Sequence, residues 1–271
     1  MDPDFDIELE LLLQGIYLKY QYDFRQYAVA SIRRRMQQAM EHFGCRTLSQ
    51  LQDRVLHEPT IFPQMLRFLT VQVSEMFRDP SYFLTLREQV FPVLRTYPSL
   101  KIWVAGCSKG EEVWSLAILL EEEGLLDRTI IYATDINPEA LRAAEAGIFG
   151  LDRMAQFSTN YQMAGGTRSL SDYYIAAYNG AMFTQSLKSQ IVFADHSLAT
   201  DNVFSEVHLV SCRNVMIYFD RELQSRAIKL FYESLIHRGY LGIGPKENLR
   251  FSPYAHAFAE IVPGERIYQR L

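Results

Sequence analysis

The stretch that decides the fold is VAGCSKGEEVWSLAILL, from Val104 to Leu120. A short apolar run breaks at Gly106, the chain turns, and an apolar helix begins after two glutamates. In an open parallel sheet, ligands bind at the carboxyl ends of the strands, which is where this turn would lie. Gly106 and Gly110 let the backbone come close to a ligand. The stretch therefore has the outline of a cofactor-binding loop.

The charges of this loop distinguish between cofactors. Its glycine spacing matches neither GxGxxG nor GxxxxGK[ST], so both phosphate-binding motifs are absent. Glu111 and Glu112 stand at the start of the helix, where carboxylates stabilise the helix end but repel a phosphate. S-Adenosylmethionine carries an ammonium and a sulfonium and no phosphate. We therefore expect this cofactor in preference to a nucleotide.

Asp135 supports the same interpretation. It ends the second β-prone run, TIIYATDI, about 25 residues after Gly110, where an acidic side chain can accept hydrogen bonds from ribose hydroxyls. An Asp before Asn-Pro is by itself as often a helix cap. Together with the glycine loop, the cofactor role is the better reading.

From Lys101 onward, β-prone runs alternate with helical patterns. The expected strands cover 101–107, 129–136, 207–213, 239–244 and 266–271, and the expected helices cover 111–123, 138–146 and 221–237. This order predicts an α/β, doubly wound, mainly parallel sheet with helices on both faces.

Two further regions complete the expected organisation. Residues 1–90 have helical periodicity and predict an all-helical N-terminal domain, followed by a cofactor-binding domain over 91–271. Between about 172 and 193, two β-prone runs flank Asn179-Gly180, and both residues accept the positive φ of a type I′ turn. We expect a small antiparallel β insertion there.

The composition narrows the classes of function. A hydrophobic content of 48% supports a substantial core, and a net charge of −5 gives no reason to expect nucleic-acid binding. The acidic start lacks the pattern of a signal peptide, and no run of 18 apolar residues occurs, so we expect a cytoplasmic protein without membrane insertion. The cysteines Cys45, Cys107 and Cys212 lie far apart, which predicts neither a metal site nor a disulfide.

Three stretches together resemble the CheR-type chemoreceptor glutamate methyltransferases. They are LTVQVSEMFRDPSYF (69–83), VAGCSKGEEVWSLA (104–117) with ATDINPEAL (133–141), and SCRNVMIYFD (211–220). The last stretch carries the most specific signature. The likeness extends over nearly the whole chain and implies a class I methyltransferase-like fold.

The resemblance implies methyl transfer from S-adenosylmethionine to glutamate carboxylates on the cytoplasmic helices of a chemoreceptor, with S-adenosylhomocysteine as the second product. By motif position, Arg78 and Tyr218 would lie at the reacting centre. The implied cofactor-binding residues are Gln72, Ser74, Arg78, Glu112, Asp135, Ser197, Leu198, Arg213 and Asn214.

Several positions depart from the family's usual pattern. Gln72 and Ser74 replace Asn and Thr, Ser197 replaces Asn, and Lys109 replaces Thr. The pair Lys246-Glu247 stands where the family usually has Ser-Glu. Because Lys109 would bring a positive charge to a sulfonium site, we expect it to point out of the pocket. The departures leave two alternatives open, a sensory scaffold that binds the cofactor without turnover and a methyltransferase acting on small carboxylic acids.

The residue types suit ester formation. A glutamate carboxylate with a pKa near ~4.3 is already ionised at neutral pH, so no general base is needed. Arg78 can fix one carboxylate oxygen and leave the other free to attack. His196 beside the pocket is expected to be a structural neighbour.

A local excess of positive charge suggests how the partner docks. The segment 25–46 carries several arginines, of which Arg33, Arg34 and Arg35 are consecutive. They would steer an acidic receptor helix toward the cleft, although a solvated helix face explains them almost as well. In the family, the β insertion of some members captures a receptor tether, and the short hairpin here favours a tether-independent enzyme.

Overall fold

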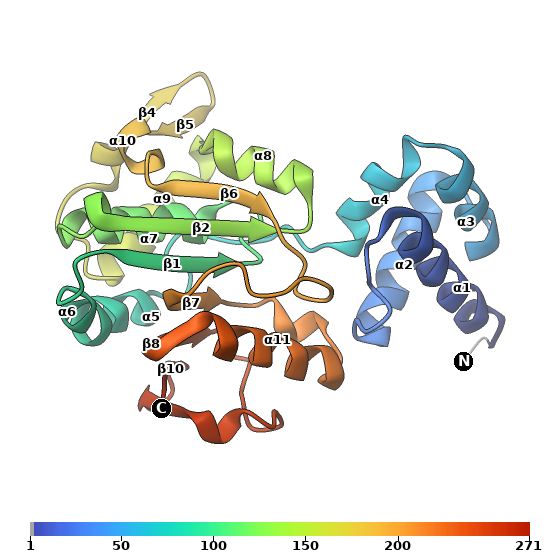
Figure 1. Cartoon of the computed structure of the whole chain (residues 1–271). Helices are drawn as coiled ribbons and strands as arrows, with labels where there is room; N and C mark the ends of the chain where they lie inside the picture. The colour runs from blue at the N-terminus through green and yellow to red at the C-terminus, as the bar shows by residue number, and fades with distance from the viewer. Residues whose placement is uncertain (1–2) are drawn as a thin grey trace.

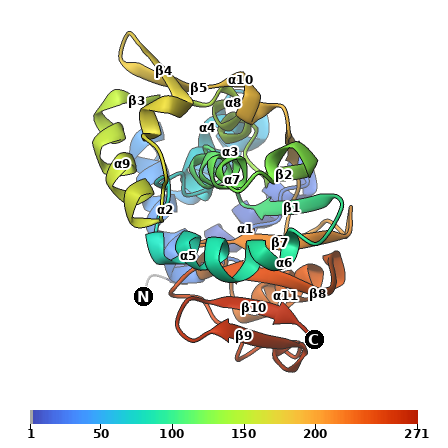
Figure 2. The ribbon, with the colours of Figure 1, turned by 90° about the vertical axis from the view of Figure 1, so that its left-hand side faces the viewer.

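The computed structural model describes residues 3–271, so the first two residues of the acidic start lie outside it. A seven-stranded sheet has the order β6-β2-β1-β7-β8-β10-β9, and a separate three-stranded sheet has the order β3-β5-β4 (Figures 1 and 2). The large sheet consists of β1 (Leu100–Ala105), β2 (Thr129–Asp135), β6 (Ile191–Asp195), β7 (Val207–Cys212), β8 (Leu235–Ile243), β9 (Phe258–Val262) and β10 (Ile267–Arg270). The predicted fold class is confirmed.

Strand direction and order place the ligand end of the sheet. The strands from β6 to β8 run parallel to their neighbours, and β10 and β9 add an antiparallel edge. The chain continues outward from β1 to β2 on one side and reaches β7 on the other. The carboxyl ends of β1 and β7 therefore form the switch point at which such sheets bind ligands.

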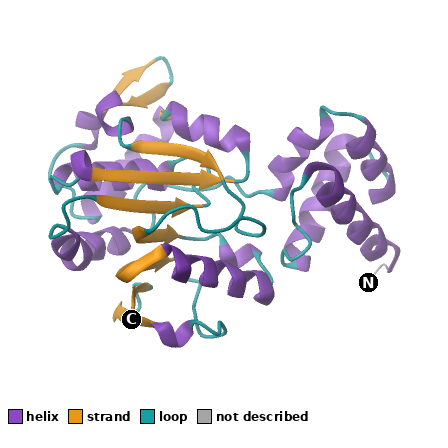
Figure 3. Cartoon of the chain, viewed as in Figure 1, coloured by secondary structure: helices purple, strands orange, loops and turns teal. Residues whose placement is uncertain are grey.

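Helices cover both faces of this sheet (Figure 3). The longer ones are α7 (Glu111–Glu122), α8 (Pro138–Ala146), α9 (Met154–Met163) and α11 (Arg221–Ser234). Side chains of β1 alternate between the two cores: Ile102 and Val104 pack with α7, whereas Trp103 packs with α11. The alternation fixes the register of β1 between its neighbours.

The N-terminal helices lie beyond the carboxyl ends of the strands, on the side to which the β1 and β2 arrows point in Figure 1. They are α1 (Pro3–Tyr20), α2 (Val29–Phe43), α3 (Leu48–His57) and α4 (Ile61–Leu69). Their apolar faces share a core of their own, drawn from residues between Leu9 and Leu69. Within the described residues, no helix is long and apolar enough to cross a membrane.

The next short helices belong by packing to the sheet. They are α5 (Pro80–Thr85), a π-helical turn (Leu86–Val90) and α6 (Phe91–Leu94). The buried apolar residues of the segment from Met76 to Leu94 lie in the same core as β1 and α7. A domain boundary in the segment 70–75 fits this packing better than the boundary near residue 90 that we expected.

The small sheet differs in detail from the expected insertion. Its hairpin, β4 (Tyr174–Ala177) and β5 (Gly180–Phe183), is joined by a third strand, β3 (Ile148–Gly150), from further upstream. The loop consists of Tyr178 and Asn179, and its positive φ of 48° falls on Tyr178, so the prediction of an Asn179-Gly180 type I′ turn was wrong.

Three other expectations are corrected. Residues 191–195 form β6, the parallel edge strand of the large sheet, and so do not belong to the insertion. The helix expected over 221–237 ends at Ser234, because Leu235 to Ile243 pair with β7 as a strand. The antiparallel strand β9 was not expected from the sequence, and it pairs with β10. Short 3-10 turns and the single-turn α10 (Gln185–Lys188) complete the chain.

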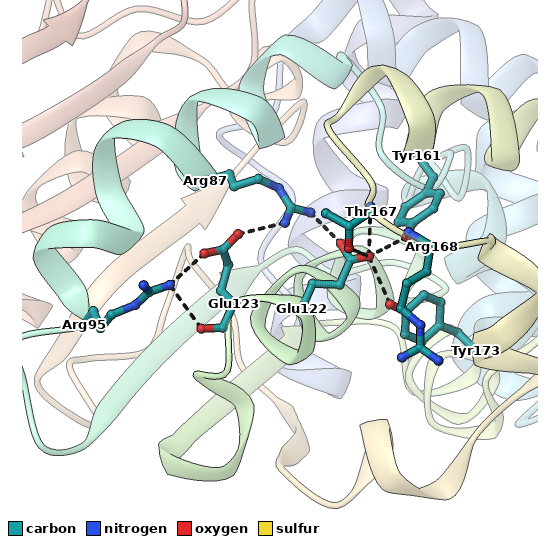
Figure 4. Close-up of polar contacts among 8 residues, drawn as sticks. All are labelled: Arg87, Arg95, Glu122, Glu123, Tyr161, Thr167, Arg168 and Tyr173. Atoms are coloured by element: carbon teal, nitrogen blue, oxygen red, sulfur yellow. Dashed lines mark hydrogen bonds and ion pairs between the residues drawn. The ribbon is translucent and has the colours of Figure 1, made fainter.

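At the C-terminal end of α7, away from the switch point, a buried carboxylate connects this helix to its neighbours (Figure 4). Glu122 accepts hydrogen bonds from the hydroxyls of Tyr161, Thr167 and Tyr173, at 2.5, 2.8 and 3.1 Å. It also forms an ion pair with Arg87 at 2.6 Å. Its partners satisfy it fully, which identifies this cluster as a structural support.

Candidate active site

A cleft lies at the carboxyl ends of β1, β2 and β7, between the sheet and the N-terminal helices. Its wall on the helical side is the segment 69–74, which leads out of α4. Of the residues that the sequence indicated, those lining the cleft are Gln72, Ser74, Arg78, Glu112, Asp135, Leu198, Arg213, Asn214 and Tyr218. Residues from five separate stretches of sequence thus meet around one cavity.

The loop after β1 is held against the end of β2. The Ser108 amide donates to Asp135 Oδ2 at 2.8 Å, and the Asn137 amide donates to Oδ1 at 2.9 Å. Ser108 in turn donates from its hydroxyl to Gln72 Oε1 at 2.6 Å. Gly106, with a φ of 73°, has no room for a side chain, because a Cβ would come within 2.5 Å of Val215 Cγ2.

Asp135 is a buried acceptor in this arrangement. Burial raises the pKa of its carboxyl above the ordinary value of 3.8, although the amides of Asn137 and Ser108 act in the opposite direction. Each carboxylate oxygen accepts one backbone hydrogen bond and keeps a further lone pair. Asp135 can therefore accept hydrogen bonds from hydroxyl groups of a ligand in the cleft.

Glu112 and Arg213 form an ion pair in the cleft wall. Their closest atoms, Arg213 Nη1 and Glu112 Oε2, are 3.1 Å apart, and the Ser211 hydroxyl donates to Glu112 Oε1 at 2.6 Å. Arg213 also reaches Asp79 at 2.7 Å and lies over the Tyr82 ring at 4.1 Å. Its side chain is 1% exposed, so packing and pairing fix its position.

Arg78 differs from Arg213 in its partners. Arg78 lines the cleft, and its side chain has no hydrogen-bond, ion-pair or ring partner among residues 3–271, while its backbone carbonyl accepts from Arg213 at 3.0 Å. A partly buried guanidinium without a partner is available to an anionic ligand.

The loop after β7 is supported from beneath by Glu247. This side chain is 5% exposed, and its carboxylate accepts from the amides of Asn214, Val215 and Ile217 at 3.0, 3.0 and 3.3 Å. The Gly244 amide donates to it as well, at 2.5 Å. Asn214 has a φ of 60°, a left-handed conformation that these bonds stabilise. Glu247 thus shapes the part of the cleft that contains Asn214.

Tyr218, on the same loop, is bound to the N-terminal helices. Its carbonyl accepts from the Ala28 amide at 2.8 Å, and the Asp220 amide donates to Gln26 at 2.9 Å. The Arg35 guanidinium lies 5.2 Å from the Tyr218 ring centroid and donates to the Leu69 carbonyl at 2.6 Å. Arg35 therefore touches both the cleft wall and the loop of Tyr218.

Two expectations about single residues are corrected. Ser197 does not line the cleft; it faces a neighbouring depression with Tyr20, Asp195 and Asp201. Arg35 is only 5% exposed, so it cannot be part of a docking surface. Glu111 points away from the cleft, where it pairs with Arg153 at 2.9 Å. Of these two glutamates, Glu112 is thus the one that lines the cleft.

The expectation for Lys109 holds, and His196 needs a closer description. Lys109 is exposed and is not among the residues that line the cleft. His196 is buried, packs edge-on against Trp103 with ring centroids 5.1 Å apart, and bonds the Asn202 carbonyl at 3.1 Å. His196 also lines the cleft, and its buried Nδ1 has no hydrogen-bond partner among the described residues, so its structural role stays a prediction.

Sequence reasoning missed the cleft residues Tyr27 and Arg35 and the support from Glu247. A signal for Arg35 was present, because its spacing from Ile32 and Ala39 places it on the buried stripe of α2. Burial raises the pKa of the Tyr27 hydroxyl, and the nearby Asp135 carboxylate adds to the effect. Tyr27 has no comparable signal, since it precedes the helix.

Comparisons with known proteins agree with this geometry. Residues 7–70 match the description "CheR methyltransferase, all-alpha domain", and residues 72–261 match "CheR methyltransferase, SAM binding domain". A Pseudomonas putida protein that carries the name Cher3 is 57% identical over 265 residues, covering 98% of this chain and 97% of its own. A "Chemotaxis protein methyltransferase" from Listeria monocytogenes is 27% identical, covering 92% and 93%.

Among solved structures, a methyltransferase from Geobacter sulfurreducens in complex with S-adenosyl-L-homocysteine covers 60% of this chain and 47% of its own. It has 14% identity and a TM-score of 0.35. At that level the likeness carries no argument about the site.

Proposed function

The chain belongs to the CheR methyltransferase family, and from this premise we propose that it transfers methyl groups to glutamate side chains of chemoreceptors. The products are glutamate methyl esters and S-adenosylhomocysteine. The acceptor carboxylates lie on the cytoplasmic helices of the receptor, so the enzyme works in the cytoplasm.

The donor set of the cleft fits S-adenosylmethionine. Asp135 would accept the ribose hydroxyls, Glu112 would attract the ammonium, and Arg213 would face the cofactor's carboxylate. Gln72, Ser74, Leu198 and Asn214 would complete the pocket. When bound, the cofactor supplies an electrophilic methyl group on a sulfonium. Ser197 does not belong to these cofactor-binding residues, because it lines another depression.

The observation that carries the proposal is the unpaired Arg78 guanidinium. Arg213, its neighbour in the cleft, is already bound to Glu112 and Asp79, whereas Arg78 has no side-chain partner among the described residues. A planar guanidinium binds a carboxylate through directed hydrogen bonds. Arg78 would hold one oxygen of the acceptor glutamate and leave the other oxygen free to attack the methyl group.

The chemistry requires positioning and removal of water, with no base. The acceptor carboxylate is ionised at neutral pH, with a pKa near ~4.3. As the carboxylate attacks a sulfonium, both charges disappear, so a cleft that excludes water favours the transition state over the separated ions. Tyr218 lines the same cavity and would donate from its hydroxyl to the acceptor carboxylate or line the path of the methyl group.

Of the three arginines named from the sequence for receptor docking, one remains a candidate. Arg34 is exposed on α2 and remains a candidate contact for an acidic receptor helix. Arg33 is paired with Asp6 at 3.1 Å, which reduces its availability. Arg35 lines the cleft and is not part of the docking surface.

The test is incubation with labelled S-adenosylmethionine, receptor cytoplasmic fragments and small carboxylic acids. We expect base-labile label on the receptor fragment. Cofactor binding without transfer would favour the sensory scaffold, and label confined to small acids would favour a small-molecule methyltransferase. Either outcome contradicts the proposal.

A further inference from the structure

A second groove includes residues of the loop that carries Tyr218. It is lined by Met216, Ile217, Arg221, Gln224, Lys246 and Phe251, with Glu247 and Asn248 at its base. Ile217 directly precedes Tyr218 in the sequence, and consecutive Cα atoms are ~3.8 Å apart. The groove therefore begins one residue away from the cleft and adjoins it.

The groove combines apolar and cationic side chains. Phe251 is 70% exposed and Ile217 is 36% exposed, and the Arg221 guanidinium lies 5.2 Å from the Phe251 ring centroid. Lys246 is exposed and has no ion-pair partner in the described part of the chain. Glu247 is turned inward and bound by backbone amides, so it contributes little to the surface.

The position of Arg221 is not favoured by the helix dipole. It is the first residue of α11, where the helix dipole disfavours a positive charge. Phe251 presents an exposed aromatic ring beside the Arg221 guanidinium. Both residues suit an occupant that is anionic along one side and apolar along another.

We propose that this groove docks the acidic, amphipathic helix that carries the acceptor glutamate. The inference rests on the proposed function and names the recognition surface for its substrate. A helix with one glutamate in the cleft places the next turn ~5.4 Å away along its axis. Acidic side chains at that distance would pair with Arg221 and Lys246, and apolar ones would cover Phe251.

The test compares three proteins in binding a receptor cytoplasmic fragment in the presence of S-adenosylhomocysteine. They are the wild type, the double variant Arg221→Glu/Lys246→Glu, and the control Arg142→Glu, whose arginine is exposed on α8. We expect the double variant to weaken binding about tenfold and to reduce its salt dependence. Affinity for S-adenosylhomocysteine should not change, and a glutamate at the start of α11 should not destabilise the helix.

A second probe is the same fragment with its non-acceptor glutamates replaced by glutamine. The wild type should bind it about as weakly as the double variant binds the acidic fragment. Equal binding of the acidic fragment by all three proteins would overturn the inference, as would groove-dependent binding to anionic phospholipid vesicles without binding to the fragment.

The two proposals fail in distinguishable ways. Methyl transfer by wild type and double variant with the same receptor KM rejects the groove and keeps the proposed function. Groove-dependent binding of the fragment without any transfer by the wild type rejects the proposed function and keeps the groove.

Discussion

At the residue scale, two arginines in one cleft have different tasks because they have different partners. Arg213 is buried, paired with Glu112 and Asp79, and stacked on Tyr82. It is part of the wall. The Arg78 side chain has no partner among residues 3–271. An incoming carboxylate can therefore accept hydrogen bonds from it without breaking existing ones. This difference makes Arg78 the better candidate for contact with the acceptor.

Asp135 gives a prediction for cofactor affinity. Burial raises the pKa of its carboxyl above 3.8, so protonation on acidification begins at a higher pH than for an ordinary aspartate. The ionised form accepts ribose hydroxyls, and protonation removes acceptor capacity. We expect S-adenosylhomocysteine affinity to fall as the pH decreases through this raised pKa.

Calorimetric titration between neutral and mildly acidic pH measures that affinity. The variant Asp135→Asn is the control: it should bind more weakly at neutral pH and show a flatter pH dependence. The same pH dependence in both proteins would assign the effect to another group.

The sequence was most informative at positions inside a motif. The loop around Gly106 and the stretch around Arg213 both line the cleft, because turn chemistry and charge require particular residue types there. Ser197 was misplaced, since a motif does not specify which side of a loop a side chain takes. Arg35 was misread as a surface charge, although its helical spacing matched the buried stripe.

At the element scale, the loop after β7 depends on a residue far away in sequence. Glu247 binds the amides of Asn214, Val215 and Ile217 and thereby fixes a left-handed backbone at Asn214. The chain after β8 and the loop after β7 are thus one unit around a buried carboxylate. Sequence patterns could not predict this, because the contact depends on the pairing of β7 with β8.

The variant Glu247→Gln tests that unit. One carboxylate oxygen becomes an amide that faces backbone donors, so two of the hydrogen bonds are lost and their N–H groups stay buried. We expect a loss of about 2–4 kcal/mol in the free energy of unfolding. Denaturant titration measures it, with Glu265→Gln, at a turn position, as the control. A loss below about 0.5 kcal/mol would contradict this role.

At the scale of the whole molecule, the N-terminal helices complete the cleft. Residues 26–28 form a short antiparallel bridge with residues 218–220, and Arg35 contacts both Leu69 and Tyr218. The sequence predicted the helical part, the parallel sheet and the insertion from periodicity and turn residues. It could not predict how the parts meet, because that depends on long-range contacts of single side chains.

The variant Arg35→Met tests this coupling, with Arg34→Met on the exposed face of α2 as the matched control. Arg35→Met should lower kcat about 10²-fold through misplacement of Tyr218 and the cleft wall. Arg34→Met should leave kcat unchanged and raise only the receptor KM. Steady-state kinetics separates the two effects, and an unchanged kcat for Arg35→Met would show that the cleft tolerates its loss.

The most direct measurement is mass-spectrometric mapping of the methyl group on a receptor fragment, with wild type and Arg78→Ala. The account predicts a base-labile ester on glutamate side chains for the wild type. It predicts a rate about 10²–10³-fold lower for Arg78→Ala at an unchanged melting temperature. Near-normal ester formation by Arg78→Ala, or a methyl group on a residue other than glutamate, would contradict it.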